Sequence, residues 1–187
     1  MSRDLCVVFR SFPLDDSSYV GDVEPIRKEA IMRYGELEWR LVVLTAEFHR
    51  HLGVYATIGA KMGLRAVEIL GCRHHAPRVD SYVGLKPPLS CMNDGLMTST
   101  GATPGHGLFS VSEVEKVRCA ARFIYEEQAI ELSLKRSYSE ELKEDIERGR
   151  TLYGNSSEYW LYVRRLALKY WLDWDRADIF DVAEVTI

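Results

Sequence analysis

The sequence predicts a single α+β domain in which helices pack against a mixed, mainly antiparallel sheet. Three observations favour this fold class. The chain has 187 residues, which suits one domain and is enough to bury a core without disulfides or a structural metal. Its composition, 47% apolar and 28% charged, is that of an ordinary globular protein. The predicted helices and strands follow one another irregularly, unlike the regular alternation of a doubly wound α/β fold.

The first 71 residues are predicted to be mainly helical. In order, we expect a strand over residues 5–9, a loop over 11–22, a helix over 25–48 and a second helix over 54–70. Pro25 suits the first turn of a helix, and Gly35 predicts a break within it. Gly71 is a typical helix stop. Gly59 and Gly63 lie on one helix face, which allows a neighbouring element to approach closely.

After residue 71, predicted strands and helices follow one another in an irregular order. We expect a strand over residues 79–83, a short helix opening at Cys91 and a loop over 101–107. Two strands should follow, over 117–125 and 130–135. The chain should then form a charged helix over 139–150, an aromatic helix from 156 or 157 to 174, and a strand over 180–187. Ser90 is the expected cap of the short helix, and Asp94 is well placed in its first turn.

Composition excludes several classes of function. The net charge is −4 and no run of Lys or Arg exceeds a pair, as at Arg164 and Arg165, so no nucleic-acid partner is expected. No apolar run approaches the roughly 18 residues needed to cross a bilayer, and residues 1–4 do not open a signal peptide. The cysteines are Cys6, Cys72, Cys91 and Cys119, without a C-x-x-C pair. Free thiols and a cytoplasmic location are therefore expected.

Three segments concentrate residue types that carry chemistry. His49 and His51 lie two apart at a break between helices and can converge on a metal ion, although such pairs are common by chance. Cys91 at a helix N-terminus would have a stabilised thiolate, unless it is a buried, inert cysteine. The glycine-rich segment 99–107 lets backbone amides approach an anion, but a plain turn fits equally well. Two further histidines, His74 and His75, are interpreted as part of an exposed loop.

Taken together, these segments resemble the core of the family formed by the E subunit of formylmethanofuran dehydrogenase. The family pattern is Phe-His-Gly-His-x-Gly-Pro, a helix with Gly and Met, then Cys-x-x-Asp, then Thr-Gly-x-Thr-x-Gly-Lys-Gly. The matching residues, in the same order over about 45–110, are Phe48, His49, His51, Gly53, Gly59, Met62, Cys91, Asp94, Thr100, Gly101, Thr103, Gly105 and Gly107. The spacing of three separate blocks makes the resemblance specific.

The resemblance implies an α+β core whose His, Cys and Asp residues gather in one cleft near a dimer interface. In the family the redox reaction belongs to the molybdenum or tungsten subunit, so methanogenesis chemistry itself is not implied. The departures from the pattern are Arg50 for Gly, Val54 for Pro, Ala102 for a frequent Cys and His106 for Lys. No cysteine follows Cys119, so the resemblance does not extend to the C-terminal zinc module of some members.

Three interpretations of these residues remain open. In the first, His49, His51 and Cys91 bind one transition metal, most plausibly zinc, and leave a fourth position open. Asp94 and His106 then act as catalytic residues that orient a ligand or move protons. The residues expected to hold a small-molecule ligand are Thr100, Gly101, Thr103 and Gly105. In the second, the same cleft belongs to a non-catalytic accessory module for a molybdenum or tungsten enzyme or its cofactor. In the third, the residues form a polar cluster without an ion. Whether the protein is an enzyme stays open.

A homodimer is expected from the resemblance and from the aromatic residues of the last helix. Six of these fall within sixteen positions: Tyr159, Trp160, Tyr162, Tyr170, Trp171 and Trp174. Aromatic side chains are enriched at protein interfaces, although all six would also fit a core.

Overall fold

Five strands form a mixed sheet in the computed structural model, which describes residues 8–72 and 76–187. Their bounds are β1 Arg78–Ser81, β2 Phe109–Val111, β3 Ala120–Tyr125, β4 Gln128–Leu134 and β5 Phe180–Glu184. The strand order is β2-β1-β3-β4-β5, with β1 and β2 parallel and every other neighbouring pair antiparallel. The predicted mixed, mainly antiparallel sheet is confirmed.

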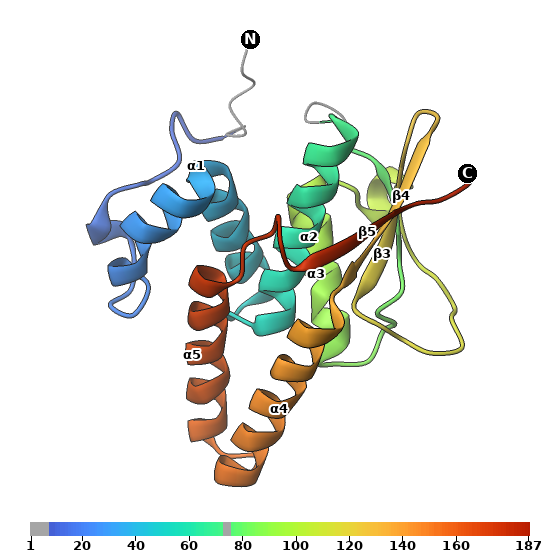
Figure 1. Ribbon diagram of the computed structural model, residues 1–187. Helices are drawn as coiled ribbons and strands as arrows, with labels where there is room; N and C mark the ends of the chain where they lie inside the picture. The colour runs from blue at the N-terminus through green and yellow to red at the C-terminus, as the bar shows by residue number, and fades with distance from the viewer. Residues whose placement is uncertain (1–7, 73–75) are drawn as a thin grey trace.

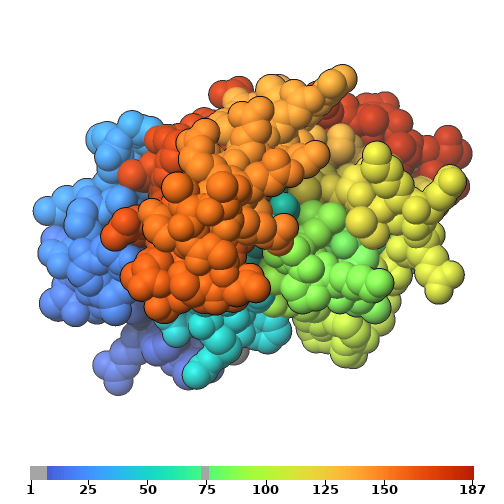
Figure 2. Space-filling model, turned by 90° about the horizontal axis from the view of Figure 1, so that it is seen from below, coloured from blue at the N-terminus to red at the C-terminus, as the bar shows by residue number. Residues whose placement is uncertain are grey.

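The helices pack around this sheet as one α+β domain. Their bounds are α1 Glu24–His49, α2 Val54–Leu70, α3 Met92–Thr100, α4 Arg136–Tyr153 and α5 Ser157–Asp173. Short 3-10 turns occupy Asp16–Ser18, Leu89–Cys91 and Pro104–His106. Figure 1 shows α2 and α3 between α1 on one side and the sheet on the other, with α4 and α5 forming a projecting hairpin. Seen from below, the orange surface of this hairpin lies next to the green surface of the segment that contains α3 (Figure 2).

Most predicted element boundaries are confirmed where glycine marks them. Gly35 has a non-helical backbone (φ 86°) inside α1, and Gly71 ends α2 in the left-handed region (φ 65°). The predicted cap by Ser90 is wrong, because a 3-10 turn leads into α3 and no side chain caps it. Strand β2 was not predicted, since three residues are too short to show an alternating pattern.

Part of the predicted N-terminal strand is also wrong. Residues 8–10 form a bend, and the remainder of the segment 5–9 lies outside the described residues. His74 and His75 also lie outside the described residues, so the loop predicted there is not assessed.

Glycines allow α2 and α3 to pack with their backbones in contact. A Cβ added at Gly59 would clash with the carbonyl group of Met92 on α3, and one added at Gly63 would clash with the Ser99 side chain. From the other helix, a Cβ at Gly95 would clash with the backbone of Ala56 and Ala60 on α2. The close approach predicted from the glycines of α2 is confirmed, and it fixes the position of the N-terminus of α3.

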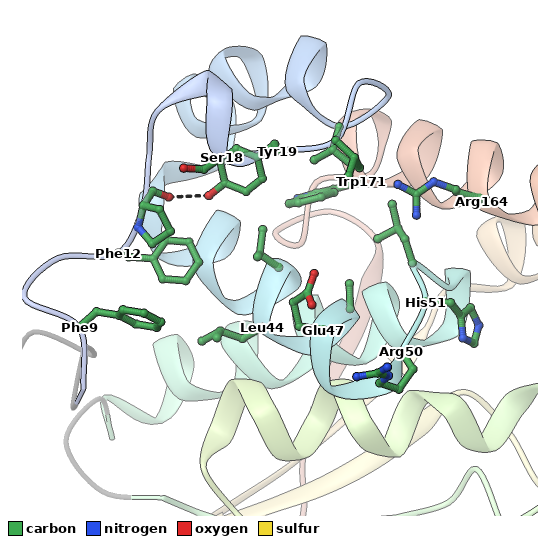
Figure 3. Close-up of a pocket in the computed structure, with 16 residues that line it drawn as sticks. Phe9, Phe12, Ser18, Tyr19, Leu44, Glu47, Arg50, His51, Arg164 and Trp171 are labelled. Carbon is green, nitrogen blue, oxygen red and sulfur yellow. Dashed lines mark hydrogen bonds between the residues drawn. The ribbon is translucent and has the colours of Figure 1, made fainter.

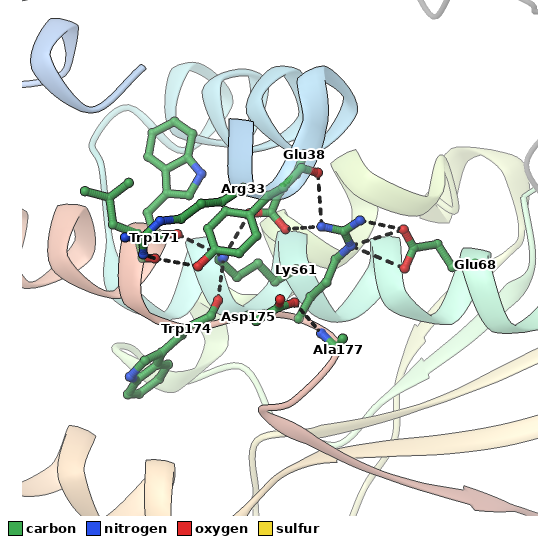
Figure 4. Close-up of polar contacts among 11 residues, drawn as sticks. Arg33, Glu38, Lys61, Glu68, Trp171, Trp174, Asp175 and Ala177 are labelled. Carbon is green, nitrogen blue, oxygen red and sulfur yellow. Dashed lines mark hydrogen bonds and ion pairs between the residues drawn. The ribbon is translucent and has the colours of Figure 1, made fainter. Parts of the chain in front are cut away.

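A buried polar cluster joins α1, α2 and the segment that follows α5 (Figure 4). Lys61, only 1% exposed, donates through Nζ to Glu38 Oε1 at 2.8 Å and to the carbonyl oxygens of Trp171 and Trp174. Arg176 pairs with Glu38 at 2.9 Å and with Glu68 at 2.8 Å. These contacts pair the buried charges and tie the chain between α5 and β5 to α1 and α2.

None of the helices in the described residues is both long enough and apolar enough to cross a bilayer.

Candidate functional site

The candidate site lies where α1 ends, α2 begins and α3 packs against both. Helix α1 ends at His49, and Arg50 takes a left-handed conformation (φ 67°) that turns the chain before α2. This turn carries His51 away from the helix axis. The glycine contacts between α2 and α3 bring the first turn of α3, which contains Asp94, beside the end of α1.

His49 and Asp94 form the central contact of the site. The Nδ1 atom of His49 lies 2.5 Å from Oδ2 of Asp94. An ionised carboxylate only accepts hydrogen bonds, so Nδ1 carries the proton and Nε2 of a neutral ring keeps a free lone pair. That Nε2 atom is buried and has no hydrogen-bond partner in the described part of the chain. Metal-binding histidines typically have this arrangement, with the second nitrogen held by a carboxylate.

His51 lies against His49, and the two Nε2 atoms face the same backbone. The ring centroids are 4.2 Å apart. A Cβ added at Gly53 would lie 3.0 Å from Nε2 of His51 and 3.5 Å from Nε2 of His49. Burial, together with the nearby His49 ring, lowers the pKa of His51. A lowered pKa favours the neutral imidazole, which is the form that binds metals.

Cys91 shares a cavity with His49 but not with His51. It lines a cavity of about 460 Å³ together with His49 and Asp94. Burial, and secondarily the negative charge of Asp94, raises the pKa of the Cys91 thiol. The expectation that the helix N-terminus lowers this pKa is therefore wrong for the protein without a metal, because desolvation and a neighbouring carboxylate outweigh the helix dipole.

The glycine-rich loop uses its predicted ligand-binding side chains internally. Thr100 Oγ1 donates to the Leu96 carbonyl oxygen at 2.6 Å and accepts from the Ala102 amide at 3.1 Å. Thr103 Oγ1 accepts from the backbone amide of His106 at 3.2 Å, and the His106 side chain is exposed.

The two glycines of this predicted set have backbone roles. Gly101 ends α3 in the left-handed region (φ 74°), and its carbonyl oxygen lies 3.3 Å from Nδ1 of His106. Gly105 lies within the 3-10 turn beside Thr103. A role for this loop in ligand binding stays a prediction.

The metal site itself also stays a prediction. Across residues 8–72 and 76–187, no group of three or more His, Cys, Asp or Glu side chains is placed to hold one ion. The structure joins His49 to His51 and to Asp94, and it places Cys91 in a cavity shared with His49 and Asp94.

Two side-chain contacts near the site are not predicted by the sequence. Asn93 donates through Nδ2 to the Gly84 carbonyl oxygen at 3.0 Å and accepts through Oδ1 from Ser81, which ties the start of α3 to the end of β1. Trp160 of α5 meets His51 edge to face at 6.0 Å between centroids. A polar residue in the first turn of a short helix was the available signal for Asn93. Trp160 gave none, because its contact joins residues far apart in the chain.

A protein-family model matches most of the chain. The family model described as FmdE, molybdenum formylmethanofuran dehydrogenase operon, matches residues 48–181. The match begins just before the histidine pair and extends well past the segment 45–110 that carries the motifs. No curated protein matches the chain.

Proposed function

Because this chain belongs to the FmdE family, we propose that it is a metal-binding protein in which His49, His51 and Cys91 hold one transition metal ion. Imidazole and thiolate ligands suit zinc best. The observation that carries the proposal is the buried Nε2 atom of His49, which has no hydrogen-bond partner among the described residues, while its Nδ1 is held by Asp94.

The residues present fit such an ion chemically. A buried nitrogen without a partner is costly, and a metal would satisfy its lone pair. Asp94 and a Cys91 thiolate would repel each other, and a dication between the histidines and the thiol would offset both charges. Three protein ligands leave one position for water or a small ligand. In this proposal Asp94 and His106 orient the ligand or move protons, and Thr100, Gly101, Thr103 and Gly105 contact it.

Metal content after purification tests the proposal. We expect one zinc per chain in the unaltered protein after zinc exchange and gel filtration, measured by mass spectrometry of the metal. Cys91→Ala and His49→Gln should lose stoichiometric zinc with unchanged circular dichroism. Cys119→Ala, which removes a partly buried thiol elsewhere, is the matched control and should keep it. A metal-free protein, or full zinc in Cys91→Ala, would rule the site out.

The family description, which refers to the operon of a molybdenum enzyme, favours a second candidate: a non-catalytic accessory module. The internal hydrogen bonds of Thr100 and Thr103 are consistent with that role. Cobalt substitution separates the two candidates. An open coordination position would make the visible spectrum of the cobalt protein change on titration with azide, whereas a closed four-ligand site would leave the spectrum unchanged.

We also propose that the protein assembles as a homodimer. Of the aromatic residues in and after α5, Tyr170, Trp171 and Trp174 are buried in the core, but Trp160 is 60% exposed beside the exposed Leu161. An exposed tryptophan next to the histidine pair suits an interface. Light scattering at micromolar concentration should give twice the chain mass, and a monomeric mass contradicts this proposal.

A further inference from the structure

A second cavity, of about 750 Å³, is lined by His51 of the histidine pair (Figure 3). It is enclosed by the N-terminal segment from Phe9 to Val23, the second half of α1 and one side of α5. Its volume is within the range of small-molecule sites, roughly 300–1,000 Å³. Most of the lining residues precede residue 48, where the family match begins, so family membership assigns this cavity no role.

The walls of the cavity are apolar, aromatic and held in place. Phe12, Tyr19 and Trp171 line it. Trp171 stacks on Trp39 at 4.5 Å between centroids, and the Trp39 indole N–H donates to the Tyr19 hydroxyl at 2.9 Å. The Tyr19 hydroxyl in turn donates to the Pro13 carbonyl oxygen. Because these rings are fixed by their neighbours, a flat apolar molecule would meet a preformed surface.

One buried donor in this wall is left without a partner. Trp171 is 1% exposed, and its indole N–H makes no hydrogen bond to any described residue. An unpaired buried N–H is uncommon in folded proteins. Because Trp171 lines the cavity, its indole N–H resonance is a suitable reporter of a molecule bound there.

The cationic side of the cavity is formed by Arg50 and Arg164, with Glu47 as the acidic group on the lining. Arg164 is already paired with Asp22 at 2.5 and 2.7 Å, whereas Arg50 has no ion pair within the described residues. Arg50 also holds a left-handed backbone (φ 67°), which is unfavourable for a side chain larger than glycine. Arg50 is the C-terminal cap of α1, where a left-handed conformation is common.

From these observations we infer that this cavity binds a small organic anion with a flat aromatic body, its charged group beside Arg50 and its ring against Tyr19 and Trp171. His51 also lines the cavity, so the ligand would lie next to the proposed metal ligands. Binding to the apolar wall and Arg50 needs no metal, so this inference and the proposed metal site can fail separately.

The test uses 2-naphthoate as the probe and metal-free, isotope-labelled full-length protein. We expect the indole N–H resonance of Trp171, assigned with Trp171→Phe, to shift saturably with one site per chain. Arg50→Gln should weaken binding about tenfold, since it removes a charge-assisted contact. Arg165→Gln, which removes an exposed arginine elsewhere on α5, is the matched control and should not change the affinity.

Blocking the cavity provides a second test, which is read on the same indole resonance in a protein that keeps Trp171. Val43→Phe adds a ring to the cavity wall and should abolish the saturable shift in a protein that still gives a folded spectrum. The inference is overturned if naphthoate causes no saturable shift, if Val43→Phe binds it equally well, or if Arg50→Gln and Arg165→Gln behave alike.

Discussion

Replacing Gly95 by alanine tests whether the backbone contact between α2 and α3 sets the geometry of the His49–Asp94 pair. An added Cβ would lie 2.8 Å from the carbonyl carbon of Gly59 and closer still to the carbonyl oxygen of Ala56. Non-bonded carbons prefer about 3.5–4.0 Å, so α3 would have to withdraw by about 1 Å. The obstructing atoms belong to the backbone of a buried helix and cannot rotate away.

The cost of this change follows from packing. Inserting a carbon into a filled core destabilises a protein by about 1–3 kcal/mol, and more where backbone obstructs it. The better helix propensity of alanine returns about 1 kcal/mol. We expect a net loss of about 2 kcal/mol, which lowers the melting temperature of a chain this long by about 4–8 °C. Asp94 moves with α3, so its contact with His49 lengthens, and the affinity of the proposed metal site for zinc should fall at least about tenfold.

Urea denaturation and zinc titration measure the two effects. Gly21→Ala is the matched control, because an added Cβ there meets nothing within 4 Å. It should change stability by less than about 0.5 kcal/mol. If Gly95→Ala proves as stable as Gly21→Ala, the helices do not depend on backbone contact and the reasoning is refuted. Lost stability with unchanged zinc affinity would refute only the link to the site.

Three further predictions concern other parts of the molecule. Lys61→Met should destabilise the protein by about 3 kcal/mol in urea unfolding, since it leaves the buried Glu38 carboxylate with Arg176 as its remaining cationic partner. The double variant Lys61→Met/Glu38→Leu should recover part of that loss. Arg50→Gly should raise stability by about 1 kcal/mol in the same assay by relieving the left-handed backbone, and an unchanged midpoint contradicts that strain. Burial raises the pKa of the Cys119 thiol from 9.0 to about 12. The protonated Cys119 thiol therefore stabilises the folded state fully below about pH 9, and this stabilisation is lost as the pH rises towards 12. The free energy of unfolding of Cys119→Ala should accordingly fall less steeply with pH over this range than that of the unaltered protein.

The helices and their ends were predictable because their signals are local. Pro25 at the start of α1, Gly35 at its kink and Gly71 at the end of α2 act through the dihedral angles of their own residues. The fold class followed from the irregular order of these elements. Strand β2 escaped prediction because its three residues are specified mainly by pairing with β1.

The residue types of the candidate site could also be predicted from the amino-acid pattern alone. The break at His49 and His51, the cysteine near the start of α3 and the spacing of these blocks identified the family, and the match over residues 48–181 confirms it. What the spacing left undetermined was the partner of each side chain, since such partners lie far apart along the chain.

Those partners depend on how the helices pack in three dimensions. His49 meets Asp94 across 45 residues because glycines let α2 and α3 touch. The same packing buries Cys91 beside a carboxylate and so raises the pKa of a thiol that its place near a helix N-terminus predicted to be low. Propensity and capping act within a few residues, whereas burial and charge pairing depend on which segments meet in space. For that reason the candidate ligands could be named from the sequence, and their protonation and contacts were set by the fold.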